Sequence, residues 1–424
     1  MDPMKAAARL PLPWLGRCRI PRDPADVLST AEEVPAREVG IPQNGVEEIW
    51  RSVEALYRSG VHPAIGLCVR HRGAVLIDRA IGHVSGNAPQ DPPDLERVAV
   101  STSTPFCLFS AAKAVHAMVI HKLCEQGLLH LEDRVSDFVP EFARHGKRHI
   151  TIRHLLSHRA GIPNLPPEAL DLDLLEQPDR ILEILAQMQP STRPGRLLAY
   201  HAMSGGFVLA EVARRVTGQD VRALLRKQIA EPLGWRWMSF GVRPEEVHLV
   251  ARNALTGPPA PPPISGLLRN ALGTDLAHVV ELSNDPRFVT GIIPSGNAMC
   301  TANELSAFYQ CLLDEGQLGG VRVFDPRTVH RATSEQSIWE FDLTLGVPLR
   351  YGLGFMLGGP VSAFGWDTPS AFGHLGLSNI LGWADPKRQL AVGLVNSGKP
   401  VVTVHVVRLV QLLVRIARTF PRED

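Results

Sequence analysis

The chain has 424 residues, of which 45% are hydrophobic and 21% are charged, and its formal net charge is +1. This composition is typical of a globular protein with a large apolar core, and the length suits one large composite domain or two. The balanced charge gives no reason to expect nucleic acid as a partner, and because no apolar run approaches 18 residues, we expect no membrane span.

The cysteines and the start of the chain indicate a cellular location. Six cysteines are scattered without the close pairs of zinc sites, and Cys68 and Cys107 lie in apolar runs typical of small buried side chains. The first residues are basic and interrupted by prolines, so they lack the continuous apolar core of a secretion signal. We therefore predict a reduced, cytoplasmic setting without a cofactor.

The N-terminal part is predicted to contain an arm, a helix and a hairpin. Prolines break residues 1–40, which we predict to be an irregular arm. Residues 44–57 place apolar side chains at helical spacing, and two strand-like runs, 64–70 and 74–81, are joined by a short turn. Because a hairpin is not stable alone, we expect its strands to join a larger sheet.

A Ser-x-x-Lys motif, Ser110 to Lys113, follows at the start of a predicted helix whose apolar residues recur at three- and four-residue steps. Residues three apart on a helix are neighbours, so the Lys113 amine is expected one turn from the Ser110 hydroxyl. A serine becomes a strong nucleophile when a base takes its proton, and burial can keep a lysine amine uncharged for that purpose. The motif also occurs by chance on ordinary helices, so its meaning depends on the rest of the chain.

The middle of the chain is predicted to be mostly helical. Thr151 is a candidate cap for a short helix that ends before Gly161. Four further helices are predicted, the last of them after a capping box of Thr301 and Glu304, at residues 179–189, 204–216, 219–234 and 301–314. Residues 240–290 are predicted to be a long irregular region, which suits equally a cleft border and a surface insertion.

Four histidines near the predicted cap raise the question of a metal site, at His145, His149, His154 and His158. They lack carboxylate or cysteine companions at ligand spacing. Packing within a helix or a loop is therefore the expected role of these side chains, and we predict no metal.

The last third of the chain predicts strands and a closing helix. The strands are expected at residues 353–356, 370–373, 380–384 and 390–395, and the helix at 402–418. Together with the N-terminal hairpin they predict an α/β (α+β) fold, with an antiparallel sheet flanked by N- and C-terminal helices and a separate helical lobe. One domain, residues 41–418, would place its sheet in 41–100 and 340–418 and its lobe in 101–339. The serine helix would lie at the seam, where clefts usually form.

Two more segments carry side chains that a Ser-Lys pair needs. Tyr200 is one of only four tyrosines, and a buried tyrosine beside a lysine ammonium can lose its proton below its usual pKa and act as a proton shuttle. His374 and Gly376 form a His-x-Gly on a predicted strand, where glycine lets a substrate approach the backbone. The alternatives are a core tyrosine with a satisfied hydroxyl and a strand bend with a buried histidine.

The motif residues occur in the order Ser110, Lys113, Tyr200 and His374. With their flanks they resemble the serine β-lactamase and penicillin-binding-protein superfamily, and more closely its class C-like esterase branch. The flanks are Leu155-Leu156-Ser157-His158-Arg159-Ala160-Gly161, Pro232-Leu233-Gly234 and Ala384-Asp385-Pro386. The resemblance covers about residues 45–415 and implies a β-lactamase/transpeptidase-like fold.

The same resemblance implies roles for individual residues. Ser110 would be the acylated nucleophile, and Lys113 and Tyr200 would share the general-base and general-acid work. The backbone N–H groups of Ser110 and Leu377 would form the oxyanion hole, beside the substrate-binding His374-x-Gly376.

Two departures from the family pattern favour a less polar substrate. The usual Tyr-x-Asn is Tyr200-His201-Ala202 here, and Ala202 cannot hold the acylamide group of a β-lactam or a peptide. His374 stands where many lactamases have the lysine of Lys-Thr-Gly, so a titratable imidazole replaces a fixed charge. Leu377-Ser378-Asn379 replaces the small glycines often found next, which narrows the floor of the cleft.

We therefore predict a serine hydrolase that cleaves small-molecule carboxylic esters through an acyl-enzyme on Ser110. The alternatives are an acyltransferase of the same fold, then a β-lactamase or D-peptidase, then an inactive relative that binds an acyl ligand. An α/β-hydrolase elbow is not complete anywhere, since the nearest run, 376–380, ends in isoleucine instead of glycine. The acyl group, the alcohol and the oligomeric state stay open.

Overall fold

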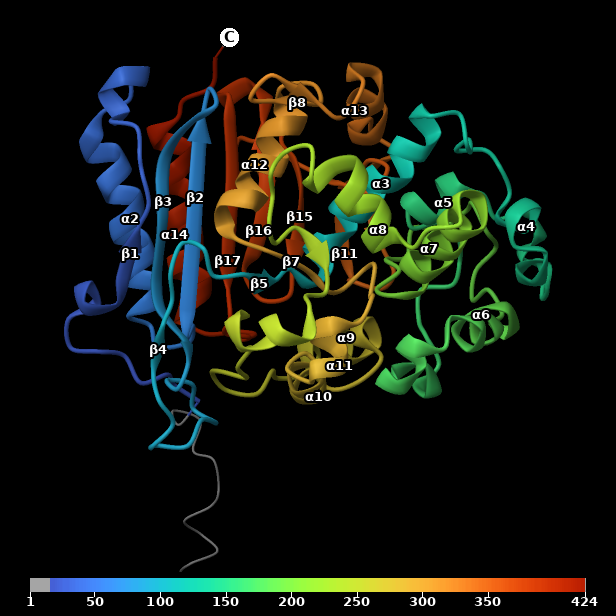
Figure 1. Ribbon diagram of the computed structural model, residues 1–424, viewed down its shortest axis with the longest axis horizontal. Helices are drawn as coiled ribbons and strands as arrows, with labels where there is room; N and C mark the ends of the chain where they lie inside the picture. Colours follow the sequence, from blue (N-terminus) through green and yellow to red (C-terminus); the bar gives the residue numbers. More distant parts are fainter. Residues whose placement is uncertain (1–15, 424) are drawn as a thin grey trace, which may run out of the picture.

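The structure, a computed structural model, describes residues 16–423 and contains one large antiparallel sheet between two sets of helices (Figure 1). In spatial order its strands are β1 (Leu28–Thr30), β3 (Ala74–Ser85), β2 (Ala64–His71), β17 (Leu390–Asn396), β16 (Ile380–Asp385), β15 (Phe372–Gly376), β12 (Met356–Leu357), β11 (Val347–Tyr351) and β10 (Ser337–Asp342). β4 (Val98–Ala99) pairs with β3 beside this order. The N-terminal hairpin joins the C-terminal strands through the pairing of β2 with β17, so the predicted fold class is confirmed.

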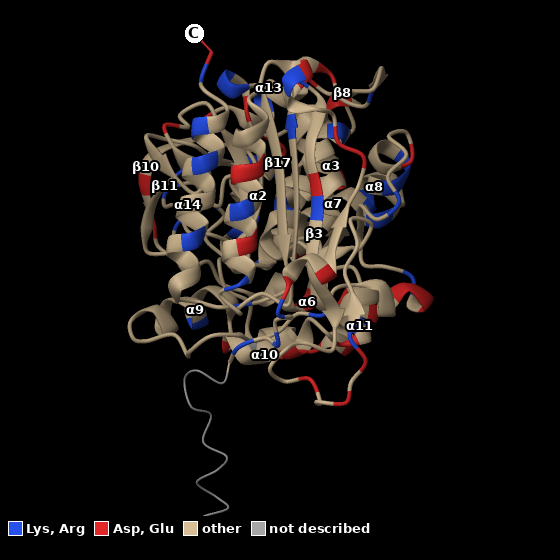
Figure 2. Ribbon diagram, turned by 90° about the vertical axis from the view of Figure 1, so that its left-hand side faces the viewer, with Lys and Arg blue, Asp and Glu red and all other residues tan. Residues whose placement is uncertain are grey.

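Side chains point alternately to the two faces of the sheet. Both faces are buried, because helices cover each of them. On β2, Ile65, Leu67 and Val69 face α2 (Gln43–Tyr57) and α14 (Val404–Thr419), which lie side by side (Figure 2). The opposite face packs on α12 (Ala302–Leu313). There a Cβ at Gly393 would lie 2.4 Å from the Ala302 carbonyl oxygen, so glycine allows this close helix–sheet approach.

The helical lobe surrounds α3 (Ala112–Glu125), which is buried on nearly every side. Its other helices are α4 (Val135–Phe138), α5 (Ile152–Leu156), α6 (Pro178–Gln187), α7 (Ser204–Thr217), α8 (Val221–Leu225), α9 (Ile264–Leu272), α10 (Leu276–Leu282), α11 (Pro286–Thr290) and α13 (Pro326–Thr333). The predicted caps are present: Thr151 accepts a hydrogen bond from the His154 N–H, and Thr301 and Glu304 form the capping box of α12.

Several predicted segments differ from the structure. Residues 240–290 are not irregular throughout, since α9, α10 and α11 lie within them; these helices are only five to nine residues long, too short for a clear periodic signal. Residues 28–30 of the predicted irregular arm form β1, whereas residues 1–15 lie outside the described part. β10 and β11 lie outside the predicted strands, and of the strand expected at 353–356 only Met356 is in a strand, β12.

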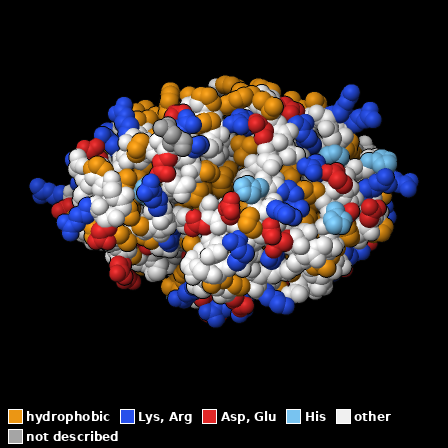
Figure 3. All heavy atoms as spheres, turned by 90° about the horizontal axis from the view of Figure 1, so that it is seen from above, with side chains coloured by type: hydrophobic (Ala, Val, Ile, Leu, Met, Phe, Trp, Pro, Cys, Tyr) orange, Lys and Arg blue, Asp and Glu red, His pale blue; other side chains and the backbone are white. Residues whose placement is uncertain are grey.

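The surface and the helices add two observations. On the face seen in Figure 3, basic and acidic side chains are interspersed. Within residues 16–423, every helix is too short or too polar to cross a bilayer. The residue bounds predicted for the sheet part and for the helical lobe stay a prediction.

Candidate active site

Ser110 lies in a single 3-10 turn, Phe109–Ala111, directly before α3. The α-helix thus begins two residues later than predicted. Phe109 has a φ of 47°, a left-handed conformation that costs energy for any residue with a side chain. The turn is held from behind, where the Leu108 N–H donates a hydrogen bond of 2.8 Å to the Ala298 carbonyl. Ser110 is therefore presented at the helix N-terminus by a strained backbone.

Lys113 lies one turn along α3 and is buried. Its Nζ donates hydrogen bonds to Ser110 Oγ at 3.3 Å and to the carbonyl of Ser295 at 3.1 Å. Burial disfavours the charged ammonium and lowers the pKa of Lys113 from 10.5 to about 7. A substantial share of the amine is therefore neutral near pH 7, as a base for Ser110 requires.

Tyr200 lies against the same pair, with its ring centroid 4.8 Å from Lys113 Nζ. Its backbone N–H donates to Oδ1 of the buried Asp342, at 3.1 Å. Burial raises the pKa of Tyr200, a hydrogen bond with the Ser110 hydroxyl lowers it, and the Asp342 charge raises it, with a net increase. The expected loss of the phenol proton below its usual pKa is therefore wrong, because the effect of desolvation on the pKa is larger than that of the hydrogen bond with Ser110.

His374 lies on β15 with its ring centroid 6.3 Å from that of Tyr200. Burial, followed by the charge of Lys113, lowers the pKa of His374 to about 3, so the imidazole is neutral. Nδ1 lies 2.8 Å from the carbonyl of Leu375, whereas the buried Nε2 has no hydrogen-bond partner among the described residues. This part of the site therefore presents a neutral acceptor instead of a cation.

Gly376 and Leu377 bring the end of β15 beside Ser110. A Cβ at Gly376 would lie 2.3 Å from the carbonyl oxygen of Leu108, so only glycine allows this approach. Leu377 lines the same cavity as Ser110. The turn that follows contains Ser378 at a φ of 54°, and its Oγ donates a hydrogen bond of 2.8 Å to the Pro400 carbonyl.

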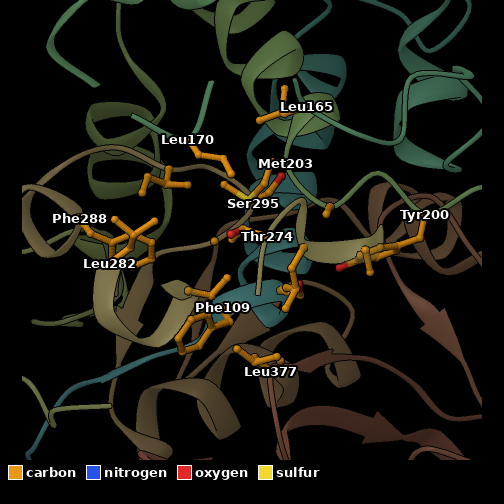
Figure 4. Close-up of a pocket in the computed structure, with 18 of the residues that line it drawn as sticks. Phe109, Leu165, Leu170, Tyr200, Met203, Thr274, Leu282, Phe288, Ser295 and Leu377 are labelled. Atoms are coloured by element: carbon orange, nitrogen blue, oxygen red, sulfur yellow. The ribbon is translucent and has the colours of Figure 1, made fainter. Parts of the chain in front are cut away.

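An apolar cavity of about 310 Å³ opens in front of Ser110 (Figure 4). Its wall comes from both parts of the fold and includes Phe109, Leu165, Leu170, Met203, Leu272, Val279, Leu282, Phe288, Ile293 and Leu377. Four of these, from Leu272 to Phe288, belong to region 240–290. Of the two interpretations left open for that region, the border of a cleft is therefore the one that holds.

A sequence model of the family described as Beta-lactamase matches residues 51–414. The chain belongs to this family. Its resemblance to the serine β-lactamase and penicillin-binding-protein superfamily is thereby confirmed.

Known family members show the same similarity. The chain is 30% identical to the esterase/beta-lactamase LipL of Mycobacterium tuberculosis (strain ATCC 25618 / H37Rv) over 307 residues, 68% of each protein. A family VIII carboxylesterase structure superposes with a TM-score of 0.74 at 27% identity, covering 89% of this chain and 98% of the other. A penicillin-binding protein homologue from Caulobacter crescentus gives a TM-score of 0.75 at 26% identity, covering 90% and 99%.

In this member of the Beta-lactamase family, two buried histidines lie close to Tyr200: His158 packs against its ring, and His201 stacks on His158. The ring centroid of His158 lies 4.7 Å from that of Tyr200, and its Nδ1 accepts a hydrogen bond of 3.2 Å from the His201 N–H. Burial lowers the pKa of both histidines, so they are neutral. Residues 16–423 contain no group of three or more His, Cys, Asp or Glu side chains placed to hold a metal ion.

Sequence reasoning missed two residues of the site. Ser295, whose carbonyl accepts from Lys113, lies in a short turn without a recognisable motif. Asp342, which accepts from the Tyr200 N–H, lies on the unpredicted strand β10. A signal existed only for His158, in the Leu-Leu-Ser-His flank, and it did not indicate a contact with Tyr200.

Proposed function

We propose that this member of the Beta-lactamase family is a serine hydrolase that cleaves carboxylic esters through an acyl-enzyme on Ser110. One observation carries the proposal: Lys113 Nζ lies 3.3 Å from Ser110 Oγ, and burial lowers the pKa of this lysine to about 7. The pair therefore combines a hydroxyl with an amine that is neutral often enough to take its proton.

In the proposed acylation step, the Lys113 amine takes the Ser110 proton as Oγ attacks the ester carbonyl. The resulting oxyanion would be bound by the backbone N–H groups of Ser110 and Leu377. The phenol of Tyr200, whose ring lies 4.8 Å from Lys113 Nζ, would donate its proton to the departing alkoxide and recover one from the Lys113 ammonium. Water then attacks the acyl group, with the same side chains reversing their roles.

The lining of the cavity favours esters over β-lactams and peptides. Neither Lys nor Arg occurs among the described residues that line it, and the neutral His374 provides no cation for a substrate carboxylate. Ala202 lines the cavity where an asparagine amide would hold an acylamide group. The names of the relatives agree, since LipL is called an esterase/beta-lactamase and a close structural neighbour a carboxylesterase.

Covalent labelling and ester turnover test the proposal. Wild-type protein should show a burst with a nitrophenyl ester and be labelled by a phosphonate, and Ser110→Ala should lose both. Ser52→Ala is the control, because Ser52 on α2 only donates to the Glu48 carbonyl, away from the cavity. Labelling that survives in Ser110→Ala removes this serine from the nucleophile role.

The same assay separates the alternatives. Turnover of nitrocefin comparable to that of esters favours a β-lactamase. A transferred acyl group in the presence of an added alcohol favours an acyltransferase. The absence of a burst with any activated ester favours an inactive, ligand-binding relative.

We also propose a cytoplasmic location, because all six cysteines are buried free thiols and such thiols persist in a reducing compartment. Fractionation of cells that produce the tagged protein tests this, with esterase activity expected in the cytosolic fraction. Activity found only outside the cytosol contradicts it.

A further inference from the structure

A second buried lysine, Lys399, lies behind the nucleophile and has no part in the proposed chemistry. It follows β17 and is fully buried. Its Nζ donates a hydrogen bond of 3.0 Å to the Asn396 carbonyl and lies 4.9 Å from the ring centroid of Phe109. A lysine at this distance over an aromatic face attracts the ring electrostatically.

The contact matters because of what Phe109 does in the chain. Phe109 directly precedes Ser110, and its left-handed φ of 47° sets the direction of the nucleophile. A strained conformation of this kind persists only when surrounding groups hold it. Lys399 contacts the side chain of the strained residue itself.

The segment that carries Lys399 also holds the opposite side of the site. The carbonyl of Pro400 accepts the 2.8 Å hydrogen bond from Ser378, a second left-handed residue next to Leu377. One short segment, 396–400, therefore contacts both strained turns, the one before Ser110 and the one after Leu377.

We propose that Lys399 is a positioning residue for acylation, which acts by holding the ring of Phe109 and through it the backbone of Ser110. The inference rests on the proposed role of Ser110 as nucleophile. Burial lowers the pKa of Lys399 to about 7, whereas nearby Cys107 raises it, so part of the lysine is protonated at neutral pH.

The chain offers a matched control in Lys147. This lysine is also fully buried, lies 5.3 Å from the ring centroid of Phe142, and donates a hydrogen bond of 2.8 Å to the Ala186 carbonyl. It is not among the residues that line the active-site cavity. Lys147→Met therefore removes a similar buried contact without touching the site.

The experiment compares Lys399→Met with Lys147→Met by pre-steady-state kinetics on a nitrophenyl ester. A small displacement of a reacting group can cost up to about a hundredfold in rate, so we expect the acylation rate constant of Lys399→Met to fall roughly ten- to a hundredfold. Substrate dissociation from the initial complex should change by less than about twofold, because Lys399 does not line the active-site cavity. Lys147→Met should acylate at the wild-type rate.

A double-mutant cycle tests the route through the ring. If Lys399 acts on Ser110 through Phe109, the double variant Lys399→Met/Phe109→Leu should acylate about as slowly as Phe109→Leu alone. Fully additive losses overturn this route. Lys399→Gln, which keeps a donor for Asn396 but no charge, should show the slow acylation of Lys399→Met.

The remaining outcomes are equally decisive. Phosphonate labelling of wild-type Ser110 is measured first. If Ser110 is not labelled, the proposed function fails. If it is labelled, the differences in acylation rate test the role of Lys399 alone. Wild-type acylation in Lys399→Met, or equal losses in Lys399→Met and Lys147→Met, overturns the proposal. The proposal is also overturned if neither Lys399→Met nor Lys399→Gln folds while Lys147→Met does, because Lys399 would then contribute to stability.

Discussion

Around Ser110, the side chains of Lys113, Tyr200 and His374 are buried, and burial favours the uncharged form of each. It lowers the pKa of the lysine to about 7 and that of the histidine to about 3, and it raises that of the tyrosine. The site thus starts with a neutral amine, a protonated phenol and a neutral imidazole. This arrangement supports the proposed roles of Lys113 as the base and of Tyr200 as a proton donor.

The first prediction at this scale concerns pH and rate. For an uncharged ester, kcat/KM should rise with pH through about 7 and then level off, because protonated Lys113 cannot take the Ser110 proton. The measurement is a pH–rate profile between roughly pH 5 and 9. A rate that is constant or falls across this range contradicts the assignment of the base.

The second prediction concerns pH and stability. Because the pKa of Lys113 is lower in the folded chain than its unfolded value of about 10.4, its burial penalises the fold below pH 7. The penalty disappears as the pH rises from the folded to the unfolded value. Lys113→Met, which has no charge to bury, should therefore melt at a higher Tm than wild type at about pH 6, with a smaller difference at about pH 9. A lower Tm for Lys113→Met at the acidic pH contradicts this.

At the scale of elements, the site depends on segments that end or turn beside it. β15 approaches the Ser110 turn through Gly376, and β10 supplies Asp342 to the backbone of Tyr200. The chemistry therefore depends on how closely these strands approach the helical lobe.

Gly376 provides the third prediction. In Gly376→Ala the new methyl would lie 2.3 Å from the Leu108 carbonyl oxygen, so β15 must move away from Ser110. Ester hydrolysis should fall about a hundredfold or more. Gly266→Ala is the control, since a methyl there meets open space on α9 and should keep the activity. Wild-type activity in Gly376→Ala contradicts the packing argument.

Asp342 provides the fourth prediction. Its Oδ1 accepts hydrogen bonds from the N–H groups of Tyr200, Thr344 and Leu345. Asp342→Ala leaves these buried donors unpaired, which should cost about 1–3 kcal/mol of unfolding free energy for each buried group and reduce ester hydrolysis. Asp342→Asn keeps an acceptor oxygen and should retain most of the unfolding free energy and most of the ester hydrolysis. Urea denaturation and ester turnover measure them, and equal behaviour of the two variants contradicts the role of the acceptor.

At the scale of the whole molecule, the cavity exists only where the sheet and the helical lobe meet. The sheet side contributes Leu375 and Leu377, whereas the lobe contributes Ala271, Leu282 and other apolar side chains. An apolar cavity closed by two parts of the fold selects substrates by size and polarity, which suits an ester with a hydrophobic group.

The fifth prediction follows from the size of the cavity. Each methylene that enters it should raise kcat/KM by up to about fourfold, the equivalent of about 0.8 kcal/mol, until the cavity is full. Ala271→Trp should shorten the longest acyl chain that the enzyme accepts and leave the hydrolysis of acetate esters unchanged. Ala277→Trp, which lies in a different cavity, should have no such effect. A panel of nitrophenyl esters measures this, and rates independent of chain length contradict it.

The sequence by itself determined the elements and motifs that depend on local pattern. The strand-like runs of β2 and β3, the helical spacing of α2 and the caps at Thr151 and Thr301 were all predictable, because they need only neighbours in the chain. The Ser-x-x-Lys spacing also predicted that Ser110 and Lys113 lie together, since residues three positions apart are neighbours on a helix.

Only the tertiary structure decided which side chains of the site are protonated and which distant residues contact them. Burial is produced by segments far apart in the chain, so neither the raised pKa of Tyr200 nor the contacts of Ser295 and Asp342 have a local signature. The left-handed backbone of Phe109 is likewise maintained by distant groups, among them Lys399. Desolvation and strain are properties of the packed chain, and a sequence pattern records only the residues that take part.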